Sequence, residues 1–361
     1  MQQTLIAGRS TTRLPERNLD LLRACAVLSV WGSHMWQTLA HTYEDHGLGR
    51  VGVLAFFLHT ALVLMGSIER SGVDSAGWVR RFYLRRIARI YPLLWFTIAL
   101  CLLLGLPFSN LRPPAVPTEV AHAWGTVWPN ALLVQNLAQA PNVLSVFWTL
   151  PLEVQMYVLL PLCYLVAVRW GARSIVVGIA AAAVFVFFVP FLPPGVQRFS
   201  VTAYVPCFLA GVLAYSNLRT YAARLPAPSW YVVLPAWWLL ALLIPVRLLP
   251  LHWVACVLLA IAVAATHELH ASAVTRCAGI VAKYSYGIYL LHVPAWSIAF
   301  DKIGNGPAAV HWIVYALLVI GLPVAAYHLV ESPAIEWMRR RTARLSAAVP
   351  SRPSVLLGPS G

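Results

Sequence analysis

The sequence predicts an all-α fold, a polytopic transmembrane helical bundle of about ten spans. Three observations lead to this prediction: 60% of the 361 residues are hydrophobic, only 11% are charged, and the mean hydropathy is +0.72. Soluble domains are about half apolar and about one quarter charged, and a water-exposed surface cannot accommodate so much more apolar area. The chain is therefore expected to have the lipid bilayer as its partner.

Apolar runs of helical length, ~20 residues each, define the predicted spans. They cover residues 19–41, 50–68, 88–106, 148–168, 174–192, 201–216, 230–247, 251–267, 282–300 and 310–330. Some contain proline, which membrane helices tolerate because neighbouring helices satisfy the freed backbone groups. We therefore expect a cytoplasmic segment over 1–18, one membrane domain over 19–344 and a disordered cytoplasmic tail over 345–361.

The basic residues predict the orientation of the bundle. With the N-terminus inside, 21 of the 26 Lys and Arg residues fall on the cytoplasmic side. The other five fall outside: Arg50, Arg112, Arg198, Arg247 and Lys302. Because cytoplasmic loops carry the excess of positive charge, both termini are predicted in the cytoplasm, and the predicted location is the inner membrane. The basic residues are spread between apolar runs, which argues against nucleic-acid binding despite the net charge of +14.

The residues that could bind a metal show no metal-binding pattern. The six cysteines lie singly, mostly within apolar runs, and no pair has metal or redox spacing. His267, Glu268 and His270 are close in sequence, but their spacing differs from the HExxH zinc pattern. No metal is therefore predicted.

Two ionisable residues lie on one face of the first predicted span. Arg23 and His34 are eleven residues apart, which places them within about 20° of each other around a helix and about 16 Å apart along it. Ionisable groups inside a membrane are costly and usually functional. The alternative is an arginine that reaches the interface and a histidine satisfied by neighbouring helices, and for His34 we favour function.

Arginines also gather just before the third predicted span. Arg86 and Arg89 are three residues apart, and Arg85 lies four before Arg89, so their guanidinium groups converge. Such planar groups bind phosphate through paired hydrogen bonds. The alternative is simple anchoring at the cytoplasmic interface, which we accept for Arg80 and Arg81.

Two further segments carry candidate residues. Glu153 opens the fourth predicted span, where an unpaired carboxylate is expensive. It could orient an imidazole or a substrate hydroxyl, or form a structural ion pair with an arginine. Tyr286, Tyr289 and His292 lie at helical spacing in a late span, where they could line a substrate groove or belong to the interfacial aromatic belt.

Taken in order along the chain, these segments resemble the acyltransferase-3 family of bacterial membrane O-acyltransferases. Arg23 and His34 fit its R-x10-H element, and Arg86 and Arg89 fit its RxxR. TLPLEVQMYVLLP is similar to its W-S-L-x-x-E-x-Q-F-Y-L-L-x-P element, SYGIYLLHVP to its S-Y-x-L-Y-L-x-H-x-P, and VESP to its final E-x-P. The second span departs from the pattern: it reads GVLAFFLHTALVL, with Leu54 where Asp is common and with His59, Thr60 and Ala61 in place of Leu-Ser-Gly.

The resemblance implies transfer of an acyl group, with acetyl favoured, from cytoplasmic acyl-CoA to a hydroxyl of a carbohydrate or glycosylated acceptor. His34 would be the general base and Glu153 would orient His34 or the acceptor. The donor would be bound by three arginines, Arg23, Arg86 and Arg89. The residues expected to line the substrate site are Trp148, Gln155, Tyr286, Tyr289 and His292. A transporter or lipid flippase with a polar central track is the alternative, and the oligomeric state is left open.

Overall fold

The fold is helical throughout the part of the chain that the structure describes. The structure is a computed structural model, and it describes residues 12–40, 47–71, 73, 77–106, 123–192, 200–245 and 247–347. The helices before the midpoint of the chain are α1 (Glu16–Leu39), α2 (Leu48–Arg70), α3 (Trp78–Leu103), α5 (Trp124–Ala131), α6 (Gln135–Ala138) and α7 (Leu150–Phe188). Those that follow are α9 (Val205–Thr220), α10 (Trp230–Leu243), α11 (Leu249–Ala265), α12 (Ala273–Ser297), α13 (Ala308–Ala326) and α14 (Ser332–Ala347). Short 3₁₀ and π-helical turns extend several of them: η1 (Ser145–Thr149), η2 (Val189–Phe191), η3 (Ser200–Tyr204), η4 (Ala227–Ser229), η5 (Ile298–Lys302) and η6 (Tyr327–Glu331).

Each of the ten predicted spans coincides with a helical segment. Among the described residues, five helical segments are long and apolar enough to cross a membrane: Leu48–Arg70, Trp78–Leu103, Ser145–Phe191, Val201–Thr220 and Ala308–Arg344. The chain is thus an all-helical membrane protein. The ten crossings and the cytoplasmic termini remain predictions, because α10 and α11 are shorter apolar helices and α1 and α12 carry many polar residues.

The fourth and fifth predicted spans are the two halves of α7, which breaks between them at Gly171, with φ 72° and ψ −166°, values that glycine adopts without steric cost. One predicted boundary differs from the observed helices. The third span was predicted from residue 88, but α3 begins at Trp78, after Gly77 in the left-handed conformation. Arg86 and Arg89 therefore lie two to three turns inside the helix, where they face neighbouring helices.

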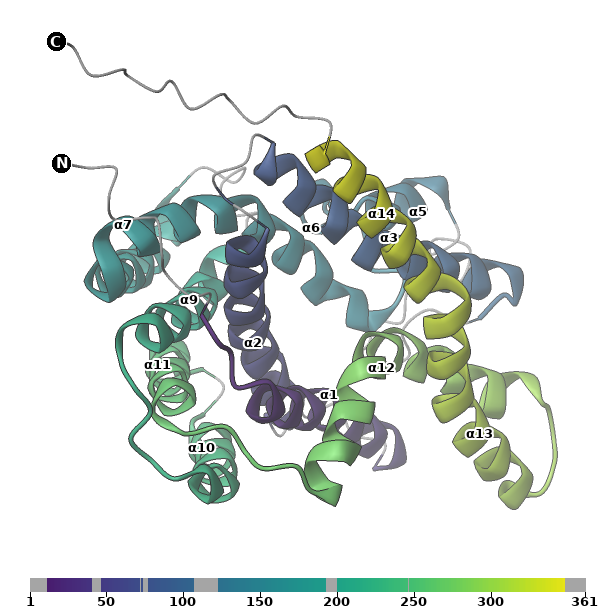
Figure 1. Cartoon of the computed structure of the whole chain (residues 1–361). Helices are drawn as coiled ribbons and strands as arrows, with labels where there is room; N and C mark the ends of the chain where they lie inside the picture. The colour runs from purple at the N-terminus through teal and green to yellow at the C-terminus, as the bar shows by residue number, and fades with distance from the viewer. Residues whose placement is uncertain are drawn as a thin grey trace, which may run out of the picture.

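Figure 1 shows α1 and α2 in the middle of the bundle, with α7, α9, α10 and α11 on one side and α12, α13 and α14 on the other. Contacts connect α1 with both α2 and α12, α2 with α9, and α3 with α14. Glycines permit the closest approaches: a Cβ at Gly52 would lie 2.6 Å from the Ala26 carbonyl oxygen, and one at Gly211 would lie 2.2 Å from that of Leu58. Small residues allow this close backbone packing in membrane helices.

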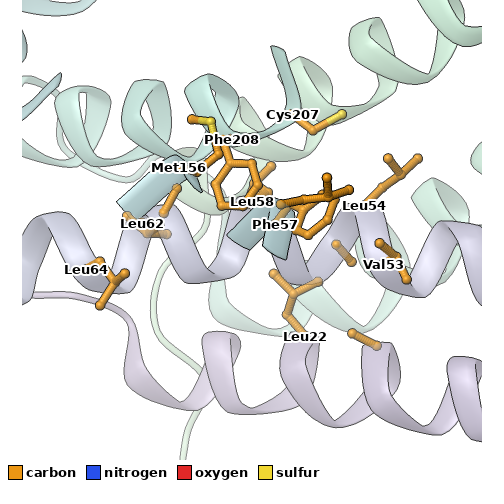
Figure 2. Packing of buried hydrophobic residues seen from close by; sticks show 14 of the residues in the cluster. Leu22, Val53, Leu54, Phe57, Leu58, Leu62, Leu64, Met156, Cys207 and Phe208 are labelled. Atoms are coloured by element: carbon orange, nitrogen blue, oxygen red, sulfur yellow. The ribbon is translucent and has the colours of Figure 1, made fainter. Parts of the chain in front are cut away.

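The main core lies around α2. Figure 2 shows Leu22 of α1 on one side of α2, and Met156 and Phe208 on the other. The rings of Phe57 and Phe208 stack with centroids 4.6 Å apart, and Leu58 has no exposed surface. Tight packing of this kind holds α2 in one orientation, and so fixes the side chains that it directs toward α3 and α7.

The connection between the third and fourth predicted spans is only partly described, because residues 107–122 lie outside the described ranges. Its second half contains α5 and α6. Asn130 connects α5 with the segment before η1, because its Nδ2 donates to the Pro141 carbonyl and its Oδ1 accepts from the Val143 amide. At the other end of the chain, α14 continues to Ala347, three residues beyond the predicted domain end, and the remaining predicted tail lies outside the described residues.

Candidate active site

Arg23 connects α1 with α12. Its Nε donates a hydrogen bond to Ser285 Oγ at 2.6 Å, and Ser285 is completely buried. The Ser285 hydroxyl in turn donates to the Ala282 carbonyl of the same helix, so the oxygen that accepts from Arg23 has a fixed orientation. The guanidinium is therefore held inside the bundle rather than at its surface.

Arg89 is held by a buried ion pair. Its Nη1 contacts Oε1 of Glu331, whose residue surface is only 1% exposed. The guanidinium carbon also lies 5.9 Å from the centre of the Tyr286 ring, and Tyr286 Oη donates to the Ile90 carbonyl at 2.9 Å. Arg89 thus joins α3, α12 and the end of η6.

Arg86 has a different environment from Arg89. Its Nε is buried and has no hydrogen-bond partner among the described residues. A guanidinium only donates hydrogen bonds, so the missing partner must be an acceptor. The neighbouring Arg85, by contrast, donates to Ser71 Oγ and belongs to the helix surface that faces the α2–α3 connection.

These arginines surround one buried cavity of about 70 Å³. The lining residues come from α1, α2, α3, α7 and α12, and are Arg23, His59, Thr60, Val63, Leu64, Arg86, Arg89, Ile90, Glu153, Tyr157 and Tyr286. The charged ones are three guanidiniums and one carboxylate, and a second carboxylate, Glu331, compensates Arg89. One positive charge is left in excess, and a buried excess charge favours a bound anion.

A second cavity of about 60 Å³ lies beside the first. It shares Arg23, Thr60, Glu153 and Tyr286 with the first, and adds Val53, Phe56, Phe57, Thr149, Leu150, Ser285 and Tyr289. Tyr289 Oη donates to the Val146 carbonyl at 2.7 Å and lies 2.6 Å from Thr149 Oγ1. The two cavities follow one another along α12 from the level of Arg86 to that of Tyr289, and form a track that is polar beside the arginines and mostly apolar beside Tyr289.

Glu153 lies among the arginines. Its Oε1 accepts a hydrogen bond from Tyr157 Oη, one turn further along α7, and the carboxylate lines both cavities beside Arg23. Of the roles expected for Glu153, this placement favours contact with a guanidinium over contact with the His34 imidazole, which lines neither cavity.

His34 pairs with His292. Nδ1 of His34 lies 2.8 Å from Nε2 of His292, and the rings stack with centroids 5.1 Å apart. Nδ1 of His292 lies 2.8 Å from the Ile288 carbonyl oxygen, which can only accept, so this nitrogen carries the proton. Because a neutral His292 ring carries only this one proton, its Nε2 accepts a hydrogen bond from Nδ1 of His34. The proton of a neutral His34 ring is then on Nδ1, and its lone pair is on Nε2.

The histidine pair and the arginines occupy successive levels of the same two helices. Arg23 and His34 both contact α12, through Ser285 and His292, so they share one face of α1. Neither cavity is lined by His34, and the second cavity ends at Tyr289, which is one helical turn before His292.

Trp148 and Gln155 lie away from both cavities. The Trp148 ring packs on Tyr204, with centroids 5.8 Å apart, and is 37% exposed. Gln155 Nε2 donates to Asn136 Oδ1 of α6 at 3.1 Å, so it connects α6 with α7. Their role in lining the substrate site stays a prediction.

Three residues of the site were not assigned a role from the sequence. Glu331 was visible as part of VESP, but nothing in one sequence identified Arg89 as its partner. Tyr157, the partner of Glu153, lies four residues after it, a spacing that places both on one helix face. His59 was noted as a departure in the second span, and it lines the arginine cavity.

The loop histidines are not part of this site. Among the described residues, no group of three or more His, Cys, Asp or Glu side chains could hold a metal ion. Glu268 instead pairs with Arg13 and Arg17, at 3.4 and 3.8 Å.

Most of these Arg, His and Glu residues lie within a segment that matches a known protein family. The family described as an acyltransferase domain matches residues 16–328. The chain belongs to the acyltransferase-3 family. The chain is also similar to Nodulation protein 10 of Rhizobium leguminosarum bv. viciae, with 25% identity over 377 residues, which are 91% of this chain and 95% of that protein. No solved structure matches this acyltransferase.

Proposed function

We propose that this acyltransferase moves an acyl group, and specifically acetyl, from cytoplasmic acyl-CoA to a hydroxyl of a carbohydrate or glycosylated acceptor in the inner membrane of a bacterium. The observation that carries the proposal is the convergence of Arg23, Arg86 and Arg89 on one buried cavity with an excess positive charge. Such a cavity suits a donor that is itself polyanionic.

The arginines bind the donor in this proposal. Arg86 has a buried donor nitrogen that lacks a partner in the described part of the chain, and phosphate or carbonyl oxygens of the coenzyme A arm would supply the acceptor. Because each of the two cavities is small, about 70 and 60 Å³, donor binding requires that side chains along α12 move apart. The arm would then extend along the polar track toward the histidine pair.

His34 is the general base in this proposal. Its Nε2 lone pair accepts the proton of the acceptor hydroxyl as the oxygen attacks the thioester carbonyl. The new C–O bond forms, the C–S bond breaks, and the proton passes from His34 to the departing thiolate of coenzyme A. General-base catalysis of this kind contributes about 10²–10⁴ in rate.

His292 and Glu153 support these groups. His292 accepts from Nδ1 of His34 and so keeps the lone pair on the other nitrogen, as the orienting partner does in other histidine bases. Glu153, held by Tyr157, would keep Arg23 and Arg86 in place and neutralise part of their charge. The acceptor would enter from the outer side, beneath the connection that contains α5 and α6.

An assay with purified protein tests the proposal. Detergent-solubilised protein is incubated with acetyl-CoA that carries a ¹³C-labelled acetyl group and with a crude preparation of cell-surface glycans, and the glycans are analysed by mass spectrometry. We expect an O-acetyl mass increase that requires the protein. Cells with and without the gene should show the same mass difference. Solute movement across proteoliposomes without acyl transfer would instead support the transporter alternative.

A further inference from the structure

His59 is a buried histidine with an unsatisfied ring nitrogen. It lies in the middle of α2 and is 3% exposed, and its Nδ1 is buried without a hydrogen-bond partner among the described residues. A buried polar atom without a partner costs about 1–3 kcal/mol. The sequence resemblance places Leu at this position, and leucine would avoid this cost.

The packing of α2 keeps the imidazole in this position. Leu58 and Leu62, on either side of it in sequence, have no exposed surface. The Leu58 carbonyl lies so close to Gly211 that a Cβ there would be only 2.2 Å away. Because α2 is fixed against α9, the His59 ring is directed to the opposite side, where it lines the arginine cavity.

The cavity surroundings restrict what His59 can bind. Three guanidiniums line the same cavity and disfavour a further positive charge, so the ring is neutral and carries one N–H, which makes Nδ1 a donor in the Nδ1–H tautomer. Arg86 Nε, which also lacks a hydrogen-bond partner among the described residues, is a donor in either case. A single acceptor oxygen would satisfy both, and a volume of about 70 Å³ leaves room for a small group that carries it.

We infer that His59 and Arg86 together bind one oxygen atom of the acyl donor, and that His59 is a donor-specificity residue. The inference rests on the proposed function, because it takes acyl-CoA as the donor. The oxygen belongs either to a phosphate or to the amide and acyl part of the pantetheine arm. His59 contacts the bound donor and not the transferred carbon, so it should affect donor affinity more than turnover.

Calorimetric titration of purified protein with acetyl-CoA tests this inference. His59→Leu should weaken binding about 3- to 10-fold, which corresponds to one lost hydrogen bond, while His59→Gln retains a donor and stays closer to the wild type. In turnover assays the KM for acetyl-CoA should rise by the same factor with kcat unchanged. The matched control is His252→Leu, since His252 is equally buried, on α11, but its Nδ1 bonds the Leu248 carbonyl. It should leave donor affinity unchanged.

A structural role for His59 gives a different result. The thermal stability of ligand-free His59→Leu should equal or exceed that of the wild type, because an unsatisfied buried atom is removed. A lower Tm with unchanged acetyl-CoA affinity would overturn the inference. Titration with acetyl-pantetheine separates the two oxygen sources: an effect of His59→Leu on this ligand supports the arm, and an effect confined to acetyl-CoA supports a phosphate.

Binding of acetyl-CoA by the wild type shows whether a negative result concerns only His59 or also the proposed function. If wild-type protein binds acetyl-CoA and His59→Leu binds it equally well, only the role of His59 is overturned. If the wild type binds no acetyl-CoA, the proposed function and the inference are overturned together.

Discussion

Nδ1 of His34 donates to Nε2 of His292 across 2.8 Å, and this bond joins two residues that are 258 positions apart in the sequence. The Ile288 carbonyl fixes the proton on the far side of the His292 ring. The pair therefore presents Nε2 of His34 as the basic nitrogen, and a polar track of arginines lies two helical turns below it along α12.

Removal of the His34 imidazole should abolish transfer. His34→Ala is expected to lower kcat by about 10²–10⁴ because the general base is lost. The measurement is acetyl transfer by purified protein, normalised to its amount in the membrane. Leu28→Ala, on the exposed side of the same helix, serves as the control and should remain active. Full activity of His34→Ala would remove His34 from the mechanism.

Substitution of His292 tests whether it positions His34. His292→Gln can place an acceptor near the same point and should retain part of the activity, whereas His292→Leu cannot. We expect His292→Leu to lower kcat with little change in the KM for the donor, because His292 contacts His34 and not the donor. Equal activity of the two variants, or a change confined to KM, would contradict a positioning role.

The buried Arg89–Glu331 pair should contribute to stability mainly by avoiding an unpaired charge. Glu331→Leu alone is expected to destabilise the protein by about 3–5 kcal/mol, and the double variant Arg89→Met/Glu331→Leu should regain most of that loss. Denaturant unfolding in detergent measures the free energy of unfolding of the single and the double variant.

The same double variant separates stability from function. It should remain defective in acetyl transfer, because the guanidinium of Arg89 is absent from the donor cavity. A double variant that is stable and fully active would show that Arg89 serves only the fold.

Periodicity and charge in the sequence were sufficient to predict the helices and the shared face of Arg23 and His34. The location of helical segments follows from apolar length, which is local information. The partners of the site residues are not local: Ser285 for Arg23, His292 for His34 and Glu331 for Arg89 are all contributed by helices late in the chain. A single sequence indicates which face of a helix is polar, but not which helix will cover it.

Other differences have backbone causes. Arg86 and Arg89 were expected just before the third span, whereas α3 begins at Trp78 and contains both, because basic residues bound an apolar run without ending the helix. The predicted division at Gly171 agrees with the structure, because a single glycine in a positive-φ conformation is enough to change the direction of the chain. His59 was noticed only as a departure from a pattern, since its burial depends on the approach of α9.

Titration of acetyl-CoA into purified wild-type and Arg86→Ala protein tests the central claim most directly. Arg86 lines the cavity with an unsatisfied buried donor, so its loss should weaken binding about 10- to 100-fold, in line with charge-assisted hydrogen bonds. Arg80→Gln, on the exposed surface of the same helix, should bind like the wild type. Saturable wild-type binding that is weakened in Arg86→Ala but not in Arg80→Gln is the predicted result. Equal affinity of wild type and Arg86→Ala, or no binding by the wild type, would contradict it.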